Sequence, residues 1–204
     1  MPICLDTEVK IMKNNVDYTS TQTQFKFDLN NSPLFIKNQH NYINILGIKQ
    51  LNSLENVSLL DIFLSKNNVV EHHYHQNAAE LVYCISGTAT VSILNPYTKQ
   101  IQNYNITPGQ VANVPQGWWH YEVALADKTH LLAIFDAPTP DVILGSDILK
   151  FTPPNIMAHT YCLDETQWKQ TTASVKPSTY IGPYEECERT ACSYPGSYYP
   201  TWYY

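Results

Sequence analysis

The chain has 204 residues and a net charge of −6, from 18 acidic and 12 basic side chains. This length suits one domain with a sizeable core and short extensions. The acidic balance argues against nucleic-acid binding, which needs a basic face to neutralise phosphates. The sequence lacks an apolar run typical of a signal peptide or a membrane span, and its five cysteines are scattered. We therefore expect a reduced, cytoplasmic protein.

Composition divides the chain into four segments. Residues 1–40, rich in Asn, Gln, Thr and Lys, are predicted to form an N-terminal arm with edge strands. Residues 41–136 contain short runs of branched and aromatic side chains, separated by turn signals at 86–87, 95–99, 107–110 and 115–117. This spacing predicts an antiparallel sandwich or barrel. The clearest predicted strands are VSLLDIFL, ELVYCIS, TATVSIL, WHYEVAL and HLLAIF.

The pattern changes after residue 136. Within residues 137–183, DVILGSDILKF and LDETQWKQ have helical spacing, and Asp164 is a suitable N-cap. Residues 184–204 form a Tyr-rich tail, and the prolines of its last twelve residues, SYPGSYYPTWYY, prevent a regular element there. Tyrosine and tryptophan are favoured at contact surfaces, so we expect this tail to mediate association.

Histidines and glutamates concentrate in EHHYHQNAAE, residues 71–80. His73 and His75 share one strand face because side chains alternate along a strand. Glu80 opens the next predicted strand, and antiparallel pairing of the two strands would bring it beside these histidines. His120 opens a later strand, after the turn at 115–117. Three imidazoles and one carboxylate, leaving two positions open, suit Mn(II), Fe(II), Ni(II) or Co(II) better than a closed tetrahedral zinc site.

Two spaced motifs carry a family resemblance. The patterns His73-x-His75-x4-Glu80-x6-Gly87 and Gly109-x5-Pro115-x-Gly117-x2-His120 resemble both signature motifs of the cupin superfamily, with Ala124 in place of the final Asn. The resemblance implies an all-β chain with a single jelly-roll cupin β-barrel and short C-terminal helices. Residues 41–183 resemble one half of the bicupin oxalate decarboxylases, and the ligand set is germin-like. This implies manganese bound by His73, His75, Glu80 and His120, a lid and helical flank after the barrel, and a homo-oligomer of two or more chains.

Two departures from that family argue against oxalate as the substrate. Oxalate decarboxylases place a substrate-binding arginine three residues before the first ligand histidine, where this chain has Val70. Its one arginine, Arg189, lies in the tail. The family's proton-donating lid glutamate aligns with Val142, next to Asp141.

Two carboxylic acids are candidates for the acid–base group. Asp141 lies beside the aligned lid position, and Glu122 shares the strand face of His120. Glu122 has two alternatives: it orients a ligand histidine, or a bulge turns it to solvent.

Three functions remain open from the sequence. The first is a metal-dependent enzyme that oxidises or decarboxylates a small, oxygen-rich, metal-chelating molecule. The second is a metallo-cupin that binds a small molecule without turnover. The third is a structural or assembly protein, such as a coat component. We expect the first, with little turnover of oxalate.

Overall fold

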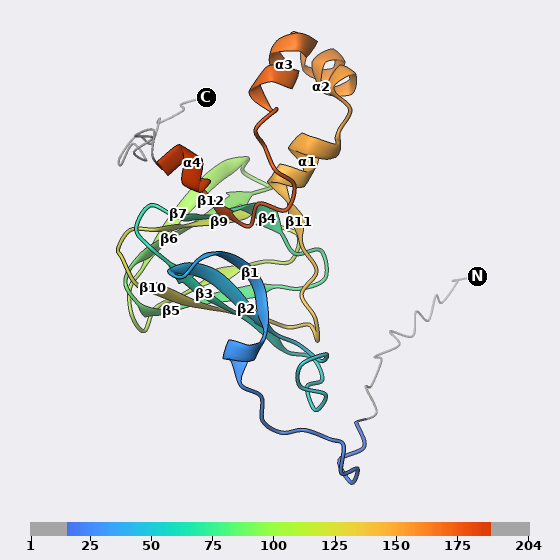
Figure 1. Ribbon diagram of the computed structural model, residues 1–204, viewed down its shortest axis with the longest axis vertical. Helices are drawn as coiled ribbons and strands as arrows, with labels where there is room; N and C mark the ends of the chain where they lie inside the picture. The colour runs from blue at the N-terminus through green and yellow to red at the C-terminus, as the bar shows by residue number, and fades with distance from the viewer. Residues whose placement is uncertain (1–15, 189–204) are drawn as a thin grey trace, which may run out of the picture.

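The computed structural model describes residues 16–188, so most of the predicted tail lies outside the described residues. Strands dominate this part of the chain (Figure 1). The strands are β1 (Pro33–Asn38), β2 (Asn41–Leu46), β3 (Ser58–Leu64), β4 (Val69–Tyr74), β5 (Glu80–Ser86), β6 (Ala89–Asn95), β7 (Gln100–Ile106), β8 (Val111–Val114), β9 (His120–Ala124), β10 (Thr129–Phe135), β11 (Ile143–Leu144) and β12 (Ile181–Gly182). The helices are the 3-10 turn η1 (Leu29–Asn31), α1 (Gly145–Phe151), α2 (Pro154–Tyr161), α3 (Glu165–Thr171) and α4 (Glu185–Glu188).

The strands form two antiparallel sheets. Sheet A has the order β1-β2-β3-β10-β5-β8, and sheet B has the order β11-β4-β9-β6-β7, with β12 also paired to β4. The predicted all-β class is therefore confirmed. The end strands β7 and β8 belong to different sheets, so the hydrogen-bond ladder does not close and the two sheets form a sandwich.

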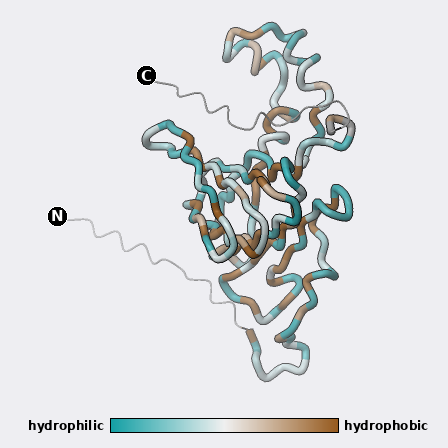
Figure 2. Tube along the Cα trace, turned by 90° about the vertical axis from the view of Figure 1, so that its left-hand side faces the viewer, coloured by the Kyte–Doolittle hydropathy of each residue, from teal (hydrophilic) through white to brown (hydrophobic). Residues whose placement is uncertain are grey.

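The core lies between the sheets and follows from alternation along the strands. In β5, every second residue is buried, and Val82 and Cys84 have no exposed surface. Val91 and Ile93 of β6 face them from sheet B and are also buried. Figure 2 shows hydrophobic and hydrophilic stretches interspersed along the central part of the chain.

Strand β7 has no hydrophobic signature, and sequence reasoning did not anticipate it. Its sequence, QIQNYNI, is exposed along most of its length. Polar pairs attach it to β6: Ser92 Oγ donates to Asn103 Oδ1 at 2.6 Å, and Thr90 Oγ1 donates to Asn105 Oδ1 at 2.7 Å. Cross-strand hydrogen bonds of this kind stabilise a strand without burying apolar surface.

Three short helices, α1 to α3, project from one end of the sandwich (Figure 1). The predicted cap at Asp164 is confirmed, because its side chain accepts a hydrogen bond from the Gln167 backbone N–H at 2.8 Å. The predicted helical run 141–151 begins instead as strand β11 and becomes helical at Gly145. Within residues 16–188, no helix combines the length and hydropathy needed to cross a bilayer.

Gly87 lies where the chain passes from β5 in sheet A to β6 in sheet B. Its φ of +75° belongs to the left-handed region, which favours glycine. A Cβ built there would lie 2.5 Å from Thr129 Oγ1 and 2.6 Å from Thr129 Cα. Thr129 is fully buried and donates to the Ala126 carbonyl at 2.7 Å, so it has little room to move.

We predict that Gly87→Ala lowers the free energy of unfolding by more than about 3 kcal/mol, because left-handed strain and a backbone clash add together. Gly109→Ala is the matched control, since Gly109 has a φ of +88° but open space around its Cβ position. It should cost only about 1–2 kcal/mol. Urea unfolding of the two variants measures the difference, and equal midpoints would contradict the steric account.

Candidate metal centre

Four side chains converge between the two sheets. They are His73, His75, Glu80 and His120, each no more than 5% exposed. One donor atom from each lies within 4.8 Å of the others. The structure thus brings together all four residues that the sequence motifs selected.

The histidines come from sheet B. His73 on β4 is paired in register with His120 on β9, and His75 follows directly after β4. The register shifts between Val70 and His73, which indicates a bulge in β4. A bulge inserts one residue and re-aims the side chains beside it.

Glu80 reaches the same point from the opposite sheet. It is the first residue of β5, which pairs with β10 and β8 in sheet A. The expected pairing between the Glu80 strand and the His73 strand is therefore wrong. The carboxylate meets the imidazoles because the two sheets face each other, and not because the two strands are neighbours.

Each imidazole is oriented by a backbone carbonyl. The Nδ1 atoms of His73, His75 and His120 lie 2.6, 2.7 and 2.9 Å from the carbonyl oxygens of Glu71, Asp141 and Trp118, respectively. A carbonyl only accepts hydrogen bonds, so each Nδ1 carries the proton. In the neutral ring, Nε2 is then left with its lone pair facing the centre.

Electrostatics at the centre link Glu80 to His120. Glu80 Oε2 lies 2.8 Å from His120 Nε2 and 3.4 Å from His75 Nε2. Burial opposes the charged form of His120, but the Glu80 carboxylate raises the pKa of His120 to about 9. Burial likewise opposes ionisation of Glu80, yet His120 holds the Glu80 pKa below its ordinary value. Burial and the neighbouring His120 lower the pKa of His73 well below 6.5.

These donors fit a divalent first-row metal ion. Donors about 2.1 Å from one ion lie roughly 3–4 Å apart, so the observed separations need only small movements. His75 Nε2 is buried without a hydrogen-bond partner, as expected for an atom that would coordinate a metal ion. Three nitrogens and one carboxylate oxygen are suitable ligands for Mn, Fe, Co or Ni. Within the described residues, this is the one group of four such side chains that gathers in this way.

The family model for "Cupin" matches residues 27–169. The chain belongs to the cupin family. It is 30% identical to the Arabidopsis thaliana germin-like protein subfamily 2 member 1 over 58% of this chain and 55% of that protein. It is 25% identical to glycinin G2 of Glycine max over 63% of this chain and 27% of that protein.

Solved structures share the fold of this cupin. Bacillus subtilis oxalate decarboxylase at pH 4.6 superposes with a TM-score of 0.68 at 20% identity, over 89% of this chain and 47% of that one. The formate complex of Lactobacillus farciminis oxalate decarboxylase gives a TM-score of 0.69 at 23% identity, over 82% and 50%. This cupin therefore spans about half of each decarboxylase chain.

A cavity adjoins the candidate ligands. Its volume is about 80 Å³. Nine of its fourteen lining residues are aliphatic. Five of these nine come from β1, β2 and β3 of sheet A, namely Leu34, Ile43, Ile45, Leu60 and Ile62. Besides His73, His75 and Glu80, the polar groups among the lining residues are the Glu122 carboxyl and the Tyr180 phenol. The lining residues include neither lysine nor arginine.

Glu122 is buried inside this cupin, on the same strand as His120. It is 1% exposed, and its Oε1 lies 3.7 Å from His120 Nε2. Both carboxyl oxygens lack a hydrogen-bond partner. Burial raises the pKa of Glu122 to about 8, against the opposing attraction of His120. A dication at the four-residue centre would favour the carboxylate and lower this pKa.

The structure separates the other two positions singled out in the sequence. Val70, which stands where the sequence comparison expects the arginine of the oxalate decarboxylases, is buried and lines the cavity. Val142 lines the cavity from the segment after β10. The Asp141 side chain is exposed and is not among the lining residues. Its backbone instead holds His75 through its carbonyl, while its N–H donates to Asn77 Oδ1 at 2.9 Å.

Sequence reasoning missed Glu71, which joins the C-terminal flank to the ligand strand. Its carboxylate accepts hydrogen bonds from the Ser146 N–H and Oγ, both at 2.8 Å, and from the Tyr180 N–H at 2.9 Å. These bonds hold Tyr180 in a left-handed conformation with a φ of 54°. Tyr180 thereby lines the cavity and stacks on Phe35, with ring centroids 5.3 Å apart. The cluster EHHYHQNAAE contained both glutamates, but no spacing rule distinguished Glu71.

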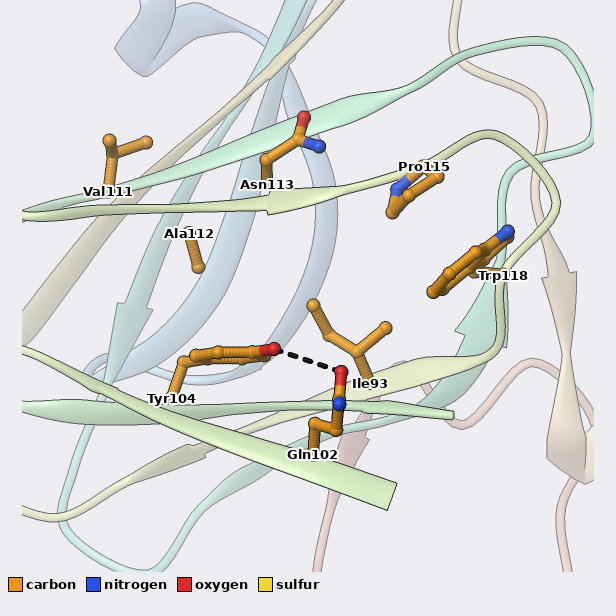
Figure 3. A pocket seen from close by; sticks show the side chains of 8 residues that line it. All are labelled: Ile93, Gln102, Tyr104, Val111, Ala112, Asn113, Pro115 and Trp118. Carbon is orange, nitrogen blue, oxygen red and sulfur yellow. Dashed lines mark hydrogen bonds between the residues drawn. The ribbon is translucent and has the colours of Figure 1, made fainter. Parts of the chain in front are cut away.

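A larger hollow on the outside of this cupin lacks comparable chemistry. Figure 3 shows its lining, in which Tyr104 donates to Gln102 at 3.0 Å and Trp118 forms one wall. Its volume is about 300 Å³, but its lining contains neither histidine nor carboxylate. We therefore place the candidate site at the smaller cavity.

We predict that the full chain binds one divalent ion and that His73→Ala weakens this binding more than about a hundredfold. Loss of groups that merely support metal ligands typically costs 10–100-fold, and a direct ligand should cost more. His72→Ala is the matched control, because the exposed His72 ring packs against Tyr121 at 4.4 Å. Elemental analysis and calorimetric titration with Mn(II) measure both variants. Equal metal content in the two would refute this ligand set.

We also predict that the metal-free protein loses stability between about pH 6.5 and 8.5. Glu122 and His120, with pKa values of about 8 and about 9, hold protons there when folded. The unfolded chain, with ordinary values near 4.3 and 6.5, has released them. Raised pKa values contribute stability at lower pH that is lost as the pH rises through the folded values.

The midpoint of urea unfolding in EDTA should therefore fall across this range, and Glu122→Gln should make the fall shallower. Metal affinity should change in the opposite direction, because the cation competes with the His120 proton. A midpoint that rises with pH in EDTA would contradict the assignment.

Proposed function

We propose that this cupin is a metal-dependent enzyme that oxidises or decarboxylates a small, oxygen-rich, metal-chelating molecule. The observation that carries the proposal is the Glu122 carboxyl, buried without a partner beside the candidate ligands and lining the same cavity. Buried unpaired carboxyls are costly and often mark functional sites. The likeness to the oxalate decarboxylases supports manganese, while Fe(II), Ni(II) and Co(II) suit the same donors.

We assign proton transfer to Glu122. A dication held by His73, His75, Glu80 and His120 would supply Lewis acidity and one-electron chemistry. In a decarboxylation, the bond to the carboxyl carbon breaks, CO2 leaves, and Glu122 supplies a proton to the remaining carbon. In an oxidation of a hydroxyl to a carbonyl, the O–H and C–H bonds of the substrate break and Glu122 takes the hydroxyl proton. Dioxygen, the oxidant, would accept the two electrons and two protons and leave as hydrogen peroxide. The exposed position of the Asp141 side chain favours Glu122 over Asp141 for this role.

Oxalate suits this cavity poorly. A bound oxalate would place a second carboxylate beside Val70 and Val142, in a wall without lysine or arginine. An isolated carboxylate is costly to desolvate without a cation or several donors. Arg189 lies outside the described residues. A less anionic chelator therefore fits the cavity better.

A non-catalytic role is the alternative. The likeness to pumpkin seed globulin, with a TM-score of 0.64 at 17% identity, shows a shared fold with a protein whose name denotes no reaction. In that case, the chain would hold a small molecule or take part in an assembly, as first considered from its Tyr-rich tail. Association into a homo-oligomer belongs to both proposals.

Turnover assays on the Mn(II)-loaded chain test the proposal. Small carboxylates and hydroxy-carbonyl compounds should be screened at pH ~4–7, with O2 uptake and CO2 release measured together. We expect turnover of a member of this panel, loss of turnover in EDTA, and a roughly 10²–10⁴-fold decrease in Glu122→Gln with its metal retained. Oxalate should stay near background.

Two outcomes would change the assignment. An oxalate kcat in the ordinary enzyme range of ~1–10³ per second would refute the argument from Val70 and Val142. Metal binding without turnover of any compound would support the binding or assembly role.

A further inference from the structure

We infer that Asn77 is a positioning residue for the candidate metal centre, because its side chain holds the segment of chain that orients His75 and forms part of the cavity wall. Asn77 lies in the loop between β4 and β5, between the candidate ligands His75 and Glu80. The inference rests on the proposed metal-dependent function. It adds to that function a residue that acts on the centre through main-chain atoms.

The segment in question, residues 139–142, lies between two stretches of paired backbone and belongs to no helix or strand. Before it, the Pro138 carbonyl accepts a hydrogen bond from the Ile48 N–H at 2.9 Å. After it, Ile143 begins β11 and pairs with β4. Pro140 has no N–H to donate, so the segment itself offers few backbone donors. Its position therefore depends on groups from elsewhere in the chain.

The side-chain amide of Asn77 supplies two such groups. Its Nδ2 donates to the Thr139 carbonyl at 2.9 Å, and its Oδ1 accepts from the Asp141 N–H at 2.9 Å. Both bonds agree on the orientation of the amide, because a carbonyl only accepts and an N–H only donates. One planar side chain thus pairs with the segment as the backbone of a neighbouring strand would.

Residues 139–142 serve the centre in two ways. The Asp141 carbonyl oxygen lies 2.7 Å from His75 Nδ1, and Pro140 and Val142 line the cavity. A displacement of this segment would remove the acceptor of His75 and part of the cavity wall together. The partner of a ligand imidazole fixes the direction of its metal-binding nitrogen and thereby affects metal affinity. Asn77 consequently influences both the ligand set and the shape of the cavity.

The loop that carries Asn77 is anchored on both sides of this residue. On one side, Gln116 Nε2 donates to the Gln76 carbonyl at 2.7 Å. On the other side, the Ala79 N–H donates to Asp136 Oδ1 at 2.8 Å. Because these bonds fix the loop independently of residues 139–142, the Asn77 amide can hold the segment in place and does not simply follow its movements.

Calorimetric titration of the full chain with Mn(II) gives the first test. We expect Asn77→Ala to weaken Mn(II) binding about tenfold, at the lower end of the range for groups that support metal ligands, because Asn77 is exposed and water competes for its bonds. Gln116→Ala is the matched control. It removes an exposed amide that bonds the backbone of the same loop but leaves residues 139–142 untouched.

The control variant should change Mn(II) affinity by no more than about twofold, as is usual for surface substitutions. The two variants each lose exposed amide contacts, so their urea unfolding midpoints without metal should be similar. A difference in Mn(II) affinity at similar stability separates a positioning role from general destabilisation of the loop.

Nuclear magnetic resonance of the metal-free full chain gives the second test, because it detects the Nδ1 proton of each ligand imidazole. We expect Asn77→Ala to speed the exchange of the His75 proton with water at least about tenfold, since the bond to the Asp141 carbonyl opens more often. The corresponding protons of His73 and His120 should exchange as before, because their acceptor carbonyls lie outside residues 139–142. Gln116→Ala should alter none of the three.

Failure of this inference differs from failure of the proposed function. The inference requires both the weaker Mn(II) binding and the faster exchange of the His75 proton in Asn77→Ala, and the absence of either overturns it. Equal effects in Gln116→Ala also overturn it, since they would indicate general loosening of the loop. In each of these cases the metal-dependent function stands. A full chain that takes up no Mn(II) overturns both, and the titration of the unsubstituted chain detects this first.

Discussion

The candidate centre depends on backbone carbonyls that fix three imidazole rings. The Nδ1–H of each ring donates a hydrogen bond to a main-chain oxygen. These oxygens come from three separate places: the β4 bulge, the segment after β10 and the turn before β9. The sheets set the first and third positions and the segment bonded to Asn77 sets the second, so the ring orientations follow from the fold itself. Substitution of a side chain next to these carbonyls leaves the acceptor atoms in place. The histidines are thus prepared for an ion without any dedicated partner side chain.

Much of the candidate site could be predicted because its determinants are local. His73 and His75 share a face through strand alternation, and Glu122 follows His120 by the same rule. Alternation also shows where such reasoning stops. Val70 lies three residues before His73 and should face away from it, yet the bulge in β4 turns both toward the interior. A bulge depends on the partner strand and cannot be read from β4 alone.

Contacts between distant segments were the part that sequence reasoning could not supply. Glu80 reaches the histidines across the sandwich, so neighbouring strands in the sequence were a poor guide to spatial neighbours. Strand β7 is held by amide and hydroxyl pairs and shows no apolar alternation. The fold class was nevertheless predictable, because β3, β5, β6, β9 and β10 carry the branched and aromatic runs that fill the core.

The outer edge of β4 is covered by segments that come much later in the sequence, so the site is completed in a fixed order during synthesis. Strand β11 covers one end of this edge and β12 the other, with the Glu71 carboxylate holding the intervening chain. Residues 181–182 therefore complete the backbone pairing of strand β4, which begins at residue 69. A ribosome must synthesise and release more than a hundred further residues after the histidine motif before that strand is enclosed. The centre is consequently finished late in synthesis, when nearly the whole described chain is available to exclude water from it.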